Sequence, residues 1–108
     1  MSTLTKIKPA DVAEGLMAGR LHLIDIREPD EHALEHIPGA VLIPLSSLEA
    51  ADVKIEAGRT AVFHCKSGMR TEKNCVRLAE RVDGDAFVLE GGLDAWKRAG
   101  LPVAGSAR

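Results

Sequence analysis

The chain has 108 residues, with 14 lysines and arginines against 16 aspartates and glutamates, and a formal net charge of −2. This length is typical of one domain, and surface scaling predicts that about 65% of the unfolded chain's surface is buried on folding. A net charge near zero and only three aromatic residues argue against a nucleic-acid-binding surface. No apolar run approaches the roughly 20 residues of a membrane-spanning helix, so we expect neither nucleic acid nor membrane as a partner.

The two cysteines and the N-terminal residues indicate the cellular compartment. Cys65 and Cys75 are too few for a disulfide scaffold, and their spacing does not suit a zinc site, so we expect no metal ion. Residues 1–6 lack the apolar core of a secretory signal peptide. We therefore predict a single cytoplasmic domain over residues 1–108, with reduced thiols and a loose tail from about residue 104.

Short apolar runs recur along the chain and predict its strands. Each run is rich in branched side chains and is continuous rather than alternating, which is typical of strands buried on both faces. A further short strand is expected near Lys6. The four clear runs cover residues 21–26, 40–43, 60–64 and 86–89.

Segments with helical periodicity lie between these runs. The longest, at 68–82, places Cys75 and Val76 on its apolar side, so Cys75 is predicted to pack in the core. The alternation of strands and helices predicts an α/β fold, with a mostly parallel sheet of four to five short strands and helices on both faces. The predicted helices cover residues 9–18, 29–36, 46–53, 68–82 and 92–99.

Cys65 follows the strand predicted at 60–64, and sites in parallel sheets form beyond the carboxyl ends of strands. A short loop leads from it into the next helix, and Gly68 allows that loop to close tightly. Loop N–H groups and the helix dipole favour negative charge there, and Lys66 and Arg70 add two cations. We therefore expect Cys65 to be a nucleophilic thiolate at neutral pH.

This loop, CKSGMR at residues 65–70, resembles the active-site loop of single-domain rhodaneses, a family of sulfurtransferases. Further blocks of this sequence resemble the family's signatures in the same order, and the resemblance covers nearly the whole chain. Two positions depart from the pattern: His32 stands where the family usually has an aromatic residue, and Glu35 where it usually has glycine. The further blocks are LIDIREPDE at 23–31, HIPGA at 36–40, EGGLDAW at 90–96 and AGLPV at 99–103.

The resemblance implies a cysteine persulfide cycle that needs no cofactor. Cys65 would take the outer sulfur of a donor such as thiosulfate and pass it to cyanide or to a thiol, either small or on a partner protein. Lys66 and Arg70 would also attract an anionic donor. The backbone N–H groups expected to bind the persulfide belong to Lys66, Ser67, Gly68, Met69 and Arg70.

Two alternatives stay open. Cysteine phosphatases, with which an arsenate reductase would share the chemistry, place five residues between the cysteine and the arginine of their loop. Some of them begin it with a His-Cys pair, as His64 and Cys65 do here. Only four residues separate Cys65 from Arg70, and this tighter loop suits a sulfur atom better than a phosphate. A catalytically silent binding module of the same fold is the second alternative, and the intact Cys65 argues against it.

Several other residues fall near the same sheet edge. We expect Asp25 and Arg27 to tie loops together through charge-assisted hydrogen bonds and so to support the Cys65 loop, with acid–base catalysis by Asp25 as the alternative. The His64 ring is expected to point away from the Cys65 side chain, because side chains alternate along a strand. Gly91 and Gly92 are interpreted as residues that give the backbone the conformational freedom for a turn, with substrate contact as the alternative.

Overall fold

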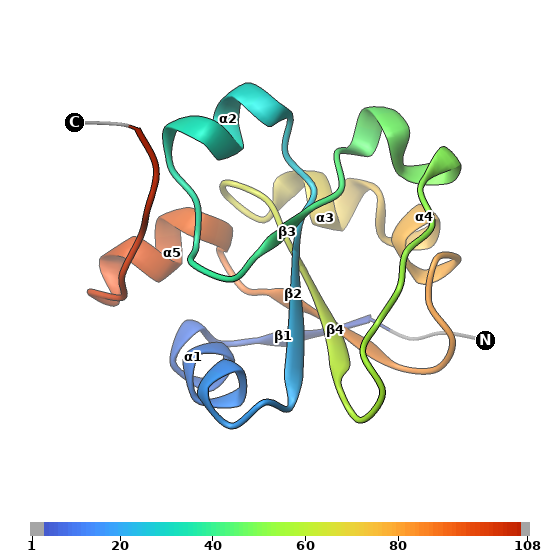
Figure 1. Cartoon of the computed structure of the whole chain (residues 1–108), viewed down its shortest axis with the longest axis horizontal. Helices are drawn as coiled ribbons and strands as arrows, with labels where there is room; N and C mark the ends of the chain where they lie inside the picture. Colours follow the sequence, from blue (N-terminus) through green and yellow to red (C-terminus); the bar gives the residue numbers. More distant parts are fainter. Residues whose placement is uncertain (1–3, 107–108) are drawn as a thin grey trace.

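Five short strands form one parallel sheet in the computed structural model, which describes residues 4–106 (Figure 1). Their order across the sheet is β1-β5-β4-β2-β3, and every pairing between neighbours is parallel. This arrangement confirms the predicted α/β fold with a parallel sheet. The strands are β1 (Leu4–Ile7), β2 (Leu21–Asp25), β3 (Val41–Leu42), β4 (Thr60–His64) and β5 (Ala86–Leu89).

Helices cover both faces of the sheet. Successive side chains of each strand point to opposite faces, and apolar side chains on both faces form a core under the helices. Helices α1 and α5 pack on one face, with Val12 and Trp96 buried against Leu23 and Val62. The opposite core contains Phe63, Cys65 and other residues, and α4 and a 3-10 helix (Leu45–Ala50) close it. The α-helices are α1 (Pro9–Met17), α2 (Pro29–Leu34), α3 (Met69–Lys73), α4 (Cys75–Ala79) and α5 (Gly92–Arg98).

Side chains alternate between the two faces of a sheet along a strand, so His64 at the end of β4 and Cys65 after it face opposite sides. Phe63 and Cys65 belong to the α4 side of the sheet, whereas Val62 belongs to the α5 side. His64 pairs in register with Asp25 of the neighbouring strand, and both are buried. The Cys65 sulfur and the His64 ring therefore lie on different sides of the chain, as strand geometry predicts.

The helix predicted over 68–82 is in fact two short helices, and this corrects the placement of Cys75. Asn74 interrupts the helix at φ −112° and ψ 19°, and its side-chain amide donates to the Arg70 carbonyl. The second helix consequently turns Leu78 into the core and leaves Cys75 exposed and Val76 68% exposed. The prediction that Cys75 packs in the core is therefore wrong.

The C-terminal tail is held by hydrogen bonds where the sequence predicts a loose segment. Ala104 and His36 exchange two backbone hydrogen bonds of 2.8 Å, and the Ser106 N–H donates to the Ala33 carbonyl. These bonds attach the chain after α5 to the α2 region. Residues 1–3, part of the segment considered for a signal peptide, and residues 107–108 of the tail lie outside the described part of the chain.

No helix within residues 4–106 has the length and apolar character required to cross a membrane.

Candidate active site

Cys65 lies immediately after β4, and its side chain is fully buried. The Gly68 N–H donates a hydrogen bond of 3.1 Å to the sulfur atom, so the loop curls around Sγ. The Thr71 hydroxyl lies 3.9 Å from the same sulfur and donates to the Gly68 carbonyl at 2.9 Å. A backbone donor at this position stabilises negative charge on the sulfur, which is the property expected of a nucleophilic thiolate.

Other N–H groups of the loop are also available to an anion. Gly68 adopts φ +97°, a conformation that favours glycine, and this turn leads directly into α3. Within residues 4–106, the backbone N–H groups of Lys66, Ser67 and Arg70 have no hydrogen-bond acceptor. Successive unpaired N–H groups in a tight loop favour the binding of an anion.

The start of α5 holds the loop from the other side. The Leu93 N–H donates to the Cys65 carbonyl and the Asp94 N–H to the Lys66 carbonyl, each at 2.9 Å. This approach requires Gly92, because a Cβ there would lie 2.6 Å from the Cys65 oxygen and 2.5 Å from the Lys66 oxygen. The glycine pair at 91–92 therefore provides the close backbone contact that fixes the loop, as well as the freedom for a turn.

Each loop cation is paired with a carboxylate from another element. Arg70 binds Glu31 of α2 through two nitrogens, at 2.7 and 2.8 Å. Hydrogen bonding from Arg70 lowers the pKa of Glu31 to about 2, so the pair stays ionised at neutral pH. Lys66 binds Asp94 at 3.1 Å in a more exposed pair. Sequence reasoning assigned both cations to the substrate and missed their partners, since no spacing rule connects residues so far apart along the chain.

Asp25 forms a buried charge network behind the loop. Arg27 contacts both of its carboxylate oxygens, with distances of 3.0 Å from Nε and 2.8 Å from Nη2, and also donates to the Glu35 carbonyl. His32 Nδ1 lies 2.9 Å from the same carboxylate. Burial raises the pKa of Asp25, but the hydrogen bonds from the charged Arg27 outweigh this effect and lower the pKa to about 2. The network connects the end of β2 to α2 through His32 and to the residue after α2 through the Glu35 carbonyl.

His64 connects this network to the cysteine through the backbone. Its Nδ1–H donates to the Cys65 carbonyl at 3.0 Å, while Nε2 lies 3.8 Å from Asp25 and has no hydrogen-bond partner among residues 4–106. Burial lowers the pKa of His64, although the Asp25 charge acts in the opposite direction. The ring is therefore neutral at neutral pH, and it positions the Cys65 carbonyl without touching the sulfur.

Within residues 4–106, no cluster of three His, Cys, Asp or Glu side chains has the arrangement needed to bind a metal ion.

The contact between Gly92 and the loop predicts an unequal effect of two alanine substitutions. We expect Gly92→Ala to lower the free energy of unfolding by at least about 1 kcal/mol more than Gly58→Ala. Both glycines have positive φ, but a Cβ at Gly58 would meet no atom within 4 Å. Urea unfolding of the two variants measures the difference. Equal losses of unfolding free energy would show that α5 is not closely packed against the loop.

The buried His64 predicts a pH-dependent stability. Its folded pKa lies below the ordinary 6.5, so the unfolded chain binds this proton first as the pH falls. The stability contributed by neutral His64 is complete above about pH 6.5 and is lost below it, with a slope of at most about 1.4 kcal/mol per pH unit. Unfolding free energies between about pH 7.5 and 5 measure this slope.

His64→Asn keeps a donor for the Cys65 carbonyl and removes the titrating ring, so we expect it to flatten the pH dependence. The matched control is His22→Asn, which removes a half-buried histidine of β2 and should leave the slope in place. A His64→Asn variant with the wild-type slope would contradict the assignment.

Comparison with known proteins agrees with this geometry. The family model of the rhodanese-like domain matches residues 8–99. A sulfurtransferase from Allochromatium vinosum is 37% identical over 81 residues, which cover 75% of this chain and 76% of the relative. MoeZ of Mycobacterium tuberculosis is 38% identical over 95 residues, 85% of this chain but 24% of that protein. The chain spans between 24% and 45% of the length of the first three curated relatives it matches.

Solved structures show the same fold. A rhodanese-related protein from Thermoplasma volcanium has a TM-score of 0.77 at 27% identity, covering 93% of this chain and 97% of that one. A thiosulfate sulfurtransferase from Pseudomonas aeruginosa has a TM-score of 0.75 at 28% identity, covering 97% of this chain and 20% of that one. With a family match over most of its length and a common fold, the chain belongs to the rhodanese-like domain family.

Proposed function

We propose that the protein is a sulfurtransferase that carries sulfur as a persulfide on Cys65. The observation that carries the proposal is the hydrogen bond of 3.1 Å from the Gly68 N–H to the cysteine sulfur, inside a loop with N–H groups that find no acceptor among residues 4–106. The relatives named as sulfurtransferases support the same activity.

The first half of the cycle loads sulfur onto Cys65. The thiolate attacks the outer sulfur of a donor, a new bond forms between Sγ and that sulfur, and the bond within the donor breaks. The leaving group departs with the bonding electron pair, as sulfite when thiosulfate is the donor. No oxidant is needed, because the outer sulfur is transferred without its bonding electrons and the leaving group keeps them.

The loop then holds the loaded sulfur. A persulfide extends one atom beyond Sγ and carries its negative charge on the outer sulfur. Backbone N–H groups of Lys66, Ser67 and Arg70 are unpaired within residues 4–106 and can donate to that atom, as in an oxyanion hole. Because α5 and His64 fix the Cys65 carbonyl, these donors are already arranged before sulfur arrives.

The second half returns the enzyme to its starting state. An acceptor nucleophile, such as cyanide or a thiolate, attacks the outer sulfur and releases the Cys65 thiolate. Donor and acceptor react in separate steps with one modified enzyme, so ping-pong kinetics is expected.

The pairing of Arg70 argues against phosphatase chemistry. A cysteine phosphatase needs its loop arginine to bind two oxygens of the phosphate. Here the Arg70 nitrogens Nη1 and Nη2 bind the Glu31 carboxylate, and only four residues separate Cys65 from Arg70. We therefore propose sulfur transfer rather than phosphate hydrolysis.

A mass measurement tests the proposed function. We expect the protein incubated with a sulfane-sulfur donor, either thiosulfate or a persulfide, to gain the mass of one sulfur atom, removable by cyanide as thiocyanate. Trypsin cleavage after Lys66 and Lys73 places Cys65 and Cys75 in different peptides, 60–66 and 74–77, so the modified residue is identified directly.

Cys65→Ser should gain no sulfur on peptide 60–66 and should lose thiocyanate formation by at least about a thousandfold, because the nucleophile is absent. Unchanged thermal unfolding would show that the variant is folded. Persistent turnover in folded Cys65→Ser, or hydrolysis of an aryl phosphate by a wild type that gains no sulfur, would contradict the proposal.

A further inference from the structure

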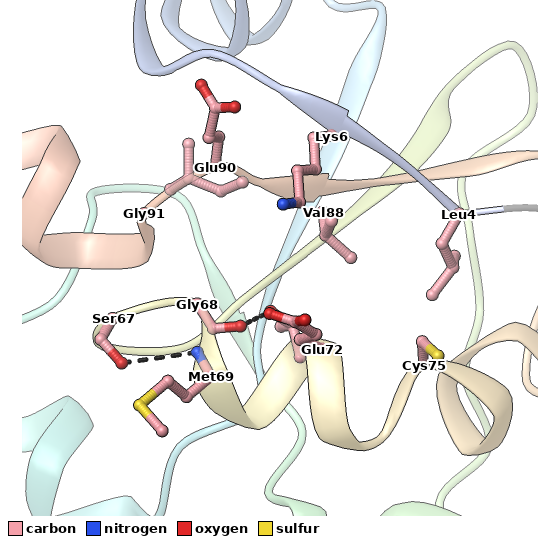
Figure 2. A pocket seen from close by; sticks show the side chains of 12 residues that line it. Leu4, Lys6, Ser67, Gly68, Met69, Glu72, Cys75, Val88, Glu90 and Gly91 are labelled. Carbon is pink, nitrogen blue, oxygen red and sulfur yellow. Dashed lines mark hydrogen bonds between the residues drawn. The ribbon is translucent and has the colours of Figure 1, made fainter.

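A cavity of about 250 Å³ lies beside the Cys65 loop, between β1 and β5 on one side and α3 and α4 on the other (Figure 2). Gly68 and Thr71 form part of its wall, and these two residues also contact the Cys65 sulfur. A ligand in the cavity is thus separated from the sulfur by a single layer of atoms. The volume is below the roughly 300–1,000 Å³ of sites for drug-sized ligands, and it suits a molecule of amino-acid size.

Oppositely charged side chains face each other across the cavity. Lys6 comes from β1 and Glu72 from α3, and Figure 2 shows their charged ends on opposite sides of the space. Neither side chain has a hydrogen-bond or ion-pair partner within residues 4–106. Glu90 also lines the cavity, with its carboxylate directed away from Glu72 (Figure 2). Leu4 and Val88 supply apolar surface between the charges.

Unlike Lys6, both cations of the Cys65 loop have an ion-pair partner among the described residues. Arg70 is bound to Glu31 and Lys66 to Asp94, so each positive charge of the loop is already compensated by a carboxylate. A doubly negative donor such as thiosulfate therefore gains little attraction from them. The Glu72 and Glu90 carboxylates beside the loop oppose it further.

We propose that this cavity binds the sulfur donor, and that the donor is the persulfide of a zwitterionic amino thiol, of which cysteine persulfide is the simplest. The proposal rests on the proposed sulfurtransferase function. Lys6 binds the donor's carboxylate and Glu72 binds its ammonium group, while the apolar side chains contact the carbon atoms between them. The outer sulfur is then directed towards Gly68 and Thr71.

The chemical step needs no other reactant. The Cys65 thiolate attacks the outer sulfur of the R–S–SH donor, the Sγ–S bond forms, and the donor's S–S bond breaks. The amino thiol leaves as its thiolate with the bonding electrons, and the proton stays on the transferred sulfur until solvent removes it. Because Cys65 is fully buried, transfer requires the backbone at Gly68 to move aside, and glycine has no Cβ to hinder this movement. The carbonyls of Cys65 and Lys66 stay bound to α5 meanwhile, so the rest of the loop keeps its arrangement.

Three donors that differ in which charged groups they carry test the assignment. They are the persulfides of cysteine, of cysteamine, which lacks the carboxylate, and of 3-mercaptopropionate, which lacks the ammonium group. The rate constant for sulfur loading on Cys65 is measured by mass spectrometry for each donor. For every donor the rate of the variant is divided by the rate of the wild type, so differences in intrinsic reactivity cancel.

We expect Lys6→Gln to slow loading from the cysteine and mercaptopropionate persulfides about two- to fivefold and to leave loading from the cysteamine persulfide unchanged. Glu72→Gln should slow loading from the cysteine and cysteamine persulfides by a similar factor and spare the mercaptopropionate persulfide. Lys8→Gln and Glu80→Gln are the controls, because both residues are exposed and neither lines the cavity. All three ratios should stay near one in these controls.

Thiosulfate provides the second comparison. We expect wild type to load sulfur more slowly from thiosulfate than from cysteine persulfide at equal concentration. Faster loading from thiosulfate, or ratios that do not depend on the charge of the donor, would overturn the assignment of the donor while leaving the sulfurtransferase function intact. Loading from none of the donors would instead contradict the proposed function itself.

Discussion

The close packing of the α5 backbone against the Cys65 loop is the constraint on which the rest of the site depends. Gly92 has no side chain, so the Leu93 and Asp94 N–H groups reach the carbonyls of Cys65 and Lys66. With its carbonyls bound on that side, the loop curls around the sulfur and keeps N–H groups that have no acceptor in the described part of the chain. A bulkier residue at the start of α5 would displace the backbone that holds the nucleophile.

Compensated charge is the second property of the site. Asp25 is bound by Arg27 and His32, and the Arg70–Glu31 pair connects the loop to α2. These pairs give the loop rigidity rather than a strong positive field, since each cation has a carboxylate in contact. The electrostatic stabilisation that remains for a loaded sulfur comes from backbone N–H groups. Lys6 and Glu72, which have no ion-pair partner in the described part of the chain, line the neighbouring cavity.

Much of the fold could be predicted because its signals are local. Continuous apolar runs identified the strands at 21–26, 60–64 and 86–89, and the strand–loop–helix pattern located Cys65 at the carboxyl edge of the sheet. The break at Asn74 could not be predicted, because the apolar spacing continues through it and the side-chain bond to the Arg70 carbonyl exists only in the folded chain. Because the sequence predicts an uninterrupted helix, it places Cys75 on the core side, whereas the break turns Cys75 outward.

Long-range partners account for the remaining differences. Glu31 is 39 residues from Arg70, and Asp94 is 28 residues from Lys66, so only the tertiary structure brings the pairs together. His32 departs from the usual family pattern, and the structure gives it a contact with the Asp25 carboxylate. Glu35, the other departure, forms an ion pair with Lys97 of α5. Both departures therefore stabilise the region around α2 rather than altering the loop.

A crystal structure of the sulfur-loaded protein tests most directly the central claim, that the loop is arranged in advance to hold a persulfide on Cys65. We expect the outer sulfur to accept hydrogen bonds from backbone N–H groups of Lys66, Ser67 or Arg70, with the Leu93 bond to the Cys65 carbonyl intact. An outer sulfur directed away from these groups, or bound to Cys75 instead, would contradict it.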